Sequence, residues 1–202
     1  MLELLSKGGV LMIPIGLCSV LVVAIVIERL WSLRFSQIIP KHALKNVESL
    51  VSRGELAAAK EACLANRDSS YGRIVLTGLE KAGERRQIIK EVVEEAGRQE
   101  VVTLERYLTL LGTIASIAPL LGLLGTVLGM IKVFTVISSV GVGDPSVLAS
   151  GIGEALITTA SGLTVAIPAV AFHRYFNRLI DQHVVALERS TLVIIDQIKS
   201  GN

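Results

Sequence analysis

The amino-acid sequence predicts an all-α membrane protein with three transmembrane helices and long cytoplasmic helical extensions. Two observations predict this fold class. Hydrophobic residues make up 51% of the 202 residues and the mean hydropathy is +0.60, which is too apolar for an ordinary soluble domain of this size. The apolar residues also gather in three blocks, each long enough to cross the roughly 30 Å hydrocarbon core of a bilayer. The formal net charge of +2 does not indicate a nucleic-acid partner.

The first apolar block predicts a transmembrane helix over residues 10–30. It contains eighteen uncharged residues before Glu28. A cleaved signal peptide is the alternative, but the short preceding segment, residues 1–9, carries both Glu3 and Lys7 and so lacks net positive charge. No small-residue cleavage motif follows the block. We therefore expect an uncleaved span.

Residues 31–106 predict a cytoplasmic helical domain, because charged residues and strong helix formers dominate this region. The sequence SSYG at residues 69–72 favours a break, and a helical apolar stripe resumes at Gln87. Cys63 in this domain and Cys18 in the first block have no CxxC or Cys/His spacing around them. Neither cysteine therefore predicts a disulfide or a metal site.

Residues 107–137 predict the second span. Twenty-five residues from Tyr107 onward carry no charge before Lys132 appears. No proline separates this block from the helical pattern that begins at Gln87, so we expect one continuous helix, with Pro119 as the point where it can bend. Such a helix would be roughly 75 Å long, and part of it would have to project into water.

The third span is predicted over residues 150–173, after a short Gly-rich link at residues 138–149. Residues 174–202 predict a cytoplasmic C-terminal helix, whose apolar-compatible positions recur at helical spacing and suit packing against the chain's own bundle. These positions are Ile180, Val184, Leu187, Thr191, Ile194 and Ile198. Basic residues flank the spans on the side of this helix and the charged domain, whereas the link has none. The positive-inside rule therefore places the N-terminus and the link outside the cytoplasm. Lys132 is the exception, and it can snorkel to the outer interface.

Glu154 is the main candidate for chemistry, because it is the only ionisable residue between Asp144 and His173. A charge in hydrocarbon costs about 3 kcal/mol or more, so an intramembrane acid is a functional hypothesis by default. On a helix with about 100° per residue, Thr158 and Ser161 lie within about 40° of Glu154. These three residues form a polar stripe that is expected to face protein or a water-filled cavity. The alternative is a solvated, idle Glu154 at the outer interface.

The second span carries a stripe of small residues that includes a GxxxG motif. Its members are Gly122, Gly125, Thr126 and Gly129. Small residues let transmembrane helices approach closely, so the glycines predict helix packing. Thr126 is the member of the stripe that can also line a polar path.

No enzyme, cofactor or metal site is predicted. An intramembrane serine protease needs an activated serine with a histidine partner, but Ser161 and His173 would lie about 16–18 Å apart along one helix. The local sequence is also TASG rather than GxSG. His42, His173 and His183 share no metal-ligand spacing, and no Walker-type phosphate loop is present.

Two motifs resemble the ExbB/TolQ/MotA family of proton-channel motor subunits: APLLGLLGTVLG at residues 118–129 and GIGEALITTASGLTVAIP at residues 151–168. The resemblance is strongest over residues 105–180. Three expected spans rather than four make the chain similar to ExbB or TolQ rather than to a flagellar MotA. The resemblance leaves ExbB, of the TonB system, and TolQ, of the Tol-Pal envelope system, both open.

The resemblance implies a multi-pass protein of the bacterial inner membrane that assembles as a homopentamer in the lipid bilayer, with a periplasmic N-terminus. The pentamer would enclose the helices of a dimer of a one-span partner, ExbD or TolR, whose aspartate carries protons. Proton-motive force would be converted to motion. In ExbB systems the recipient is TonB, which energises outer-membrane import of iron-siderophores or vitamin B12.

By motif match, the resemblance implies that the pore residues are Thr126, Glu154 and Thr159. Helical geometry disagrees at one position, because Thr159 lies about 140° from Glu154 whereas Thr158 lies beside it. Both threonines therefore remain candidates, together with Ser161 from the polar stripe. Two further functions stay open: a membrane scaffold that does not conduct, and a channel that conducts protons without a partner.

Overall fold

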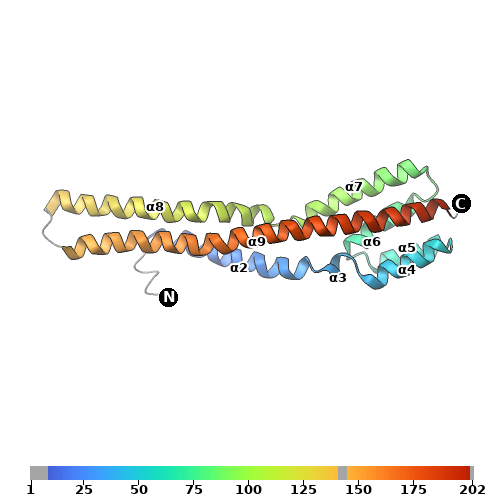
Figure 1. The fold of residues 1–202 in the computed structure, drawn as a ribbon, viewed down its shortest axis with the longest axis horizontal. Coiled ribbons are helices and arrows are strands. Elements are labelled where there is room, and N and C mark those ends of the chain that lie inside the picture. Colours follow the sequence, from blue (N-terminus) through green and yellow to red (C-terminus); the bar gives the residue numbers. More distant parts are fainter. Residues whose placement is uncertain (1–8, 141–144, 201–202) are drawn as a thin grey trace. The chain divides into compact units, whose positions relative to one another are not determined.

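The structure is a computed structural model that describes residues 9–140 and 145–200. These residues form eight helices (Figure 1). Their bounds are α2 (Met12–Ser32), α3 (Phe35–Ile38), α4 (Lys41–Ser52), α5 (Leu56–Ala65), α6 (Ser70–Glu80), α7 (Arg86–Leu104), α8 (Leu108–Val140) and α9 (Pro145–Ser200). The expected outer segment, apart from Gly9, and residues 141–144 of the expected link lie outside the described residues.

The contacts within the chain divide it into two compact units. The first, here called the membrane unit, comprises residues 1–28 and 107–175. The second, here called the charged unit, comprises residues 29–106 and 176–202. Because α2 and α9 each contribute residues to both units, each unit is held together by segments far apart in the sequence.

Three helical segments of the described chain are long and apolar enough to cross a membrane. They cover Met12–Ser32, Arg86–Ser138 and Leu148–Ile198, with mean hydropathies of 2.2, 2.2 and 1.8. Each also leaves large apolar side chains uncovered, such as Leu17 on α2, Leu120 on α8 and Ile167 on α9, which are all more than 60% exposed. Apolar exposure on this scale is typical of surfaces that face lipid or another chain. The predicted all-α class with three membrane-competent helices is confirmed.

The expected continuous helix from Gln87 through the second apolar block is wrong. The helix α7 ends at Leu104 and α8 begins at Leu108. Between them Tyr107 has a φ of +63°, a left-handed conformation that costs a non-glycine residue about 1–2 kcal/mol. Within the charged unit, the buried guanidinium of Arg29 donates a hydrogen bond to the carbonyl oxygen of Leu104 at 2.9 Å. This bond gives a partner to a carbonyl at the C-terminus of α7, because the last carbonyl groups of a helix have no hydrogen-bond donor within the helix.

The charged unit contains α3 to α7 and the C-terminal part of α9. The predicted break near SSYG lies between α5, which ends at Ala65, and α6, which begins at Ser70. Ser69 is the N-cap of α6, since its hydroxyl accepts a hydrogen bond from the Gly72 amide at 3.1 Å. In the C-terminal stripe, five of the six predicted positions are at most 6% exposed: Ile180, Leu187, Thr191, Ile194 and Ile198. The stripe therefore packs within its own unit, as its spacing indicates.

Candidate functional site

The membrane unit is built around a close contact between α8 and the first part of α9, which run side by side (Figure 1). We call this contact the α8–α9 seam. A Cβ added to Gly122 would lie 3.0 Å from Cα of Thr159, and one added to Gly129 would lie 2.9 Å from Cβ of Ala155. A Cβ added to Gly125 would overlap the side chain of Thr158. The structure thus places all three glycines of the α8 stripe against α9, where a larger residue would separate the helices.

Small residues on α9 form the other side of the seam, and the sequence analysis missed them. A Cβ added to Gly162 would lie only 2.5 Å from the carbonyl oxygen of Ala118, and one added to Gly151 would overlap the side chain of Val133. Further buried small residues continue along the same helix at Ala155, Ala166 and Ala169. Their recurrence at intervals of three, four and seven residues was the signal in the sequence that could have identified this face.

The hydroxyl groups near Glu154 differ in their burial and in their hydrogen-bond partners. Thr158 is 1% exposed in the seam and donates to the carbonyl oxygen of Glu154 at 2.8 Å. Ser161 likewise donates to its own helix, to the carbonyl oxygen of Ile157 at 2.8 Å. Thr159 is half-buried and donates across the seam to the carbonyl oxygen of Gly122 at 2.9 Å. The Thr159 hydroxyl therefore links the two helices.

Thr126 lies one residue beyond the buried Gly125 and is half-buried. Its hydroxyl donates to the carbonyl oxygen of Leu123 within α8 at 2.6 Å. The structure therefore gives Thr126 a partner in its own helix and shows no bond between it and the other candidates.

Glu154 forms an ion pair that the sequence analysis did not foresee. The Nζ atom of Lys132 on α8 lies 2.9 Å from Oε2 of Glu154 on α9. The Glu154 side chain is 25% exposed and that of Lys132 is 67% exposed. On the other side of the carboxylate, a Cβ added to Gly9 would overlap Oε1, so the chain just before α2 passes directly against this group. Three segments of the membrane unit thus meet at Glu154.

His173 lies at the other end of the membrane unit. A Cβ added to Gly112 on α8 would lie 2.9 Å from Nε2 of His173 on α9, so the imidazole fills the space that the glycine leaves. Ser161 uses its hydroxyl on its own helix. The structure therefore gives no support to a serine–histidine catalytic pair.

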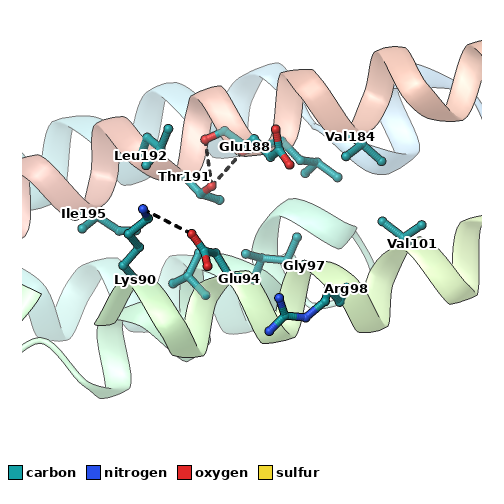
Figure 2. A pocket seen from close by; sticks show the side chains of 13 residues that line it. Lys90, Glu94, Gly97, Arg98, Val101, Val184, Glu188, Thr191, Leu192 and Ile195 are labelled. Atoms are coloured by element: carbon teal, nitrogen blue, oxygen red, sulfur yellow. Dashed lines mark hydrogen bonds and ion pairs between the residues drawn. The ribbon is translucent and has the colours of Figure 1, made fainter. Parts of the chain in front are cut away.

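The charged unit contains a cavity of about 430 Å³ between α7 and the C-terminal part of α9 (Figure 2). Branched apolar side chains such as Val93 and Leu187 line its walls. Charged groups also line it, and Lys90 pairs there with Glu94 at 3.4 Å (Figure 2). Among the residues that the structure describes, no group of three His, Cys, Asp or Glu side chains could hold a metal ion. The cavity is therefore a gap in the packing of the charged unit, and its lining does not indicate a catalytic or metal site.

The shifted pKa values of the charged unit have structural causes. Arg73 binds both oxygens of the Glu100 carboxylate at 2.6 Å, and this hydrogen bonding raises the pKa of the arginine. Burial raises the pKa of the Cys63 thiol to about 11 and also raises the pKa of Tyr71. A thiol that stays protonated at neutral pH is a poor nucleophile. These pKa shifts follow from burial and from one ion pair, and they do not indicate catalysis.

The comparison with known proteins adds the family to this geometry. Residues 66–189 match the sequence profile of the MotA/TolQ/ExbB proton channel family. This chain belongs to that family. Members of the MotA/TolQ/ExbB family are non-enzymatic subunits of transport motors, so the chain is a proton-channel subunit rather than an enzyme.

Relatives within the family carry both ExbB and TolQ names. The chain is 33% identical over 196 residues to the biopolymer transport protein exbB1 of Vibrio cholerae, which covers 93% of this chain and 84% of the relative. It is 32% identical over 189 residues to the putative biopolymer transport protein ExbB-like 3 of Synechocystis, and this alignment covers 91% of this chain and 88% of the relative. It is also 40% identical over 102 residues to the Tol-Pal system protein TolQ of Haemophilus influenzae, and this alignment covers 50% of this chain and 43% of the relative.

Proposed function

We propose that this chain is the proton-channel subunit of an ExbB–ExbD-type motor that uses the proton-motive force to energise TonB-dependent outer-membrane import of iron-siderophores or vitamin B12. The observation that carries the proposal is a lone acid, Glu154, held between helices of a proton-channel family member. Two relatives with ExbB names align with more than 90% of the chain, whereas other ExbB relatives align with 50% to 63% and the TolQ relative with 50%. The two widest of these alignments, and the larger number of ExbB names, support the ExbB type.

The proposed arrangement is a homopentamer in the bacterial inner membrane around a dimer of an ExbD-like, one-span partner. We place the spans at residues 10–30, 107–137 and 150–173. The charged unit faces the cytoplasm, and the N-terminus and the link between α8 and α9 are periplasmic. The exposed apolar side chains of α2, α8 and α9 support this arrangement, because a pentamer and its lipid would cover them.

Glu154, Thr126 and Thr159 are the proposed pore residues, with the partner's aspartate carrying protons beside them. The burial of the two neighbouring threonines favours this assignment. Thr158 is 1% exposed within the seam and contacts Gly125, so its role is helix packing. Thr159 is half-buried at the edge of the seam, where another chain can reach it. Ser161 is half-buried one helical turn from Thr158 and lies on the side of α9 that carries Glu154.

The polar groups of a single subunit do not extend far enough along the helix to carry a proton across the membrane. Ser161 comes seven positions after Glu154, which is about 10 Å of helix axis, whereas the hydrocarbon core is about 30 Å thick. The rest of the path has to come from other chains. One proton crossing 100 mV yields about 2.3 kcal/mol, so useful work needs several coupled steps. Both arguments support a multi-subunit motor.

The test uses cells whose uptake of an iron-siderophore depends on this chain and its partner. Glu154→Ala and Glu154→Gln should each abolish uptake while the complex still assembles. Glu188→Gln, which changes an exposed acid of the charged unit, is the matched control and should leave uptake unchanged. Full uptake with Glu154→Gln would instead support a non-conducting scaffold, since glutamine keeps the hydrogen bond.

Proteoliposomes separate the motor from a channel that conducts alone. The purified chain without its partner should conduct few protons, and the complex should conduct more. Equal flux in the two preparations would contradict the motor.

A TolQ-type subunit of the Tol-Pal system is the second candidate, because identity to the TolQ relative reaches 40% over its shorter alignment. Complementation distinguishes the two. Restored siderophore uptake in cells lacking ExbB supports the first function, and restored envelope integrity in cells lacking TolQ supports the second.

A further inference from the structure

Lys132 and Glu154 are the two charged residues of long apolar stretches. No other Lys, Arg, Asp or Glu occurs between residues 107 and 143, and Glu154 is alone between Asp144 and His173. Although 22 positions separate them, the Nζ and Oε2 atoms lie 2.9 Å apart. A charge in an apolar segment is costly alone and much less so beside its counter-ion, so this contact accounts for both charges.

We propose that Lys132 is the exchangeable counter-ion of Glu154 and acts as a positioning residue at the entrance of the proton path. The inference rests on the proposed function, because it assigns Lys132 a part in the proton step at Glu154. Lys132 holds the carboxylate while no proton is bound, and it releases the carboxylate when a proton arrives.

The unequal exposure of the two side chains indicates which one moves. The Glu154 side chain is 25% exposed and is enclosed by α8, α9 and the chain at Gly9. The Lys132 side chain is 67% exposed and ends in a flexible four-carbon stem that can reach water. Breaking the pair therefore moves the ammonium outward and leaves the carboxyl group in place.

The backbone at Gly9 passes close to the other oxygen of the carboxylate. A side chain at this position would overlap Oε1 of Glu154, and the φ of +69° is one that glycine adopts readily. Among the described residues, Lys132 is the charged group paired with Glu154, and the chain before α2 contributes backbone at this point. The carboxylate is thus paired with Lys132 through one oxygen, and the other oxygen lies close to the backbone at Gly9.

The proton step balances without any further reactant. One proton from the outer solution binds the Glu154 carboxylate and makes the neutral acid. Lys132 keeps its three ammonium protons and its charge, and it turns to water. When the proton leaves towards the partner, the carboxylate returns and the ion pair forms again.

The experiment measures how readily Glu154 reacts with dicyclohexylcarbodiimide in the purified complex of this chain and its partner, using mass spectrometry. This apolar reagent reacts with the neutral acid and not with a paired carboxylate. Lys132→Met should raise the labelling of Glu154 several-fold and lower proton flux several-fold. Lys132→Arg should restore both, because arginine keeps the positive charge. Lys90→Met, which breaks an exposed pair in the charged unit, is the control and should change neither.

Unchanged labelling in Lys132→Met, or no restoration by Lys132→Arg, would overturn the proposal. If Lys132→Met fails to assemble, the double variant Lys132→Met with Glu154→Gln decides. A counter-ion role predicts that the double variant assembles again because no unpaired charge remains, and its failure to assemble contradicts that role. Full proton flux in Glu154→Gln would instead remove the proposed function itself, whatever the labelling shows.

Discussion

Gly162→Ala tests the close packing of α8 against α9 most directly. The added Cβ would lie 2.5 Å from the carbonyl oxygen of Ala118 and 3.1 Å from Cα of Gly122. Both are backbone atoms and cannot rotate away, so the helices have to separate by about 0.9 Å to reach an ordinary contact of 3.4 Å. The hydrogen bond from Thr159 to Gly122, now 2.9 Å, would lengthen to about 3.8 Å with that movement and would be lost.

The expected loss in the free energy of unfolding is about 2 kcal/mol. Overpacking a well-packed contact costs about 1–3 kcal/mol, and the lost hydrogen bond costs about 1 kcal/mol more. Alanine offsets part of this loss, because it stabilises a helix interior by about 0.5–1 kcal/mol relative to glycine. Gly153→Ala measures this gain from replacing glycine by alanine on its own. It lies in the same helix, and no atom lies within 4 Å of the added Cβ, so it should stabilise the protein.

Unfolding of the purified protein in mixed micelles, followed by circular dichroism as the SDS fraction rises, measures both variants. Gly162→Ala should unfold at a lower SDS fraction than the wild type and Gly153→Ala at the same or a higher one. If the two variants unfold together, the seam is not limited by backbone contact and the reasoning fails.

The charged unit gives three further predictions. Arg73→Met leaves Glu100, whose side chain is 12% exposed, without its partner. Because Arg73 is itself 40% exposed, the expected loss in the free energy of unfolding is at the lower end of about 1–3 kcal/mol. Arg98→Met breaks a pair whose two side chains are both exposed and should leave the thermal unfolding nearly unchanged. Iodoacetamide at pH 8 should leave the wholly buried Cys63 unmodified until the protein unfolds, as peptide mass spectrometry would show. The folded pKa of Cys63, about 11 against an ordinary 9.0, means that the unfolded state ionises first. Stability should therefore fall as pH rises from 9 to 11, and less steeply in Cys63→Ala.

The three membrane-competent helices and the charged region were predictable because hydropathy and charge are local properties of the sequence. The break between α7 and α8 was not. Residues 105–107 contain neither glycine nor proline, and Tyr107 takes its left-handed φ of +63° against its own preference. Contacts of the folded chain, including the hydrogen bond from Arg29 to Leu104, fix this segment, and no local pattern encodes them.

The choice between Thr158 and Thr159 shows a second limit. A helical wheel gives the angles between side chains of one helix, but it does not say which face meets a neighbour. That orientation is set by where α8 offers space, and Gly125 offers it directly opposite Thr158. The pairing of Lys132 with Glu154 was hidden for the same reason, because it depends on the rotation of two helices about their axes.

The closeness of the seam also limits where protons can pass. At Gly122, Gly125 and Gly162 even a methyl group would meet the facing helix, so a chain of water molecules does not fit between α8 and α9 of one subunit. Under the proposed function, a proton that reaches Glu154 therefore travels outside these close contacts. The ammonium of Lys132, whose side chain is 67% exposed, lies beside Glu154. On that proposal a second chain supplies the opposite wall of the path, so the close packing within one subunit leaves it an incomplete channel by itself.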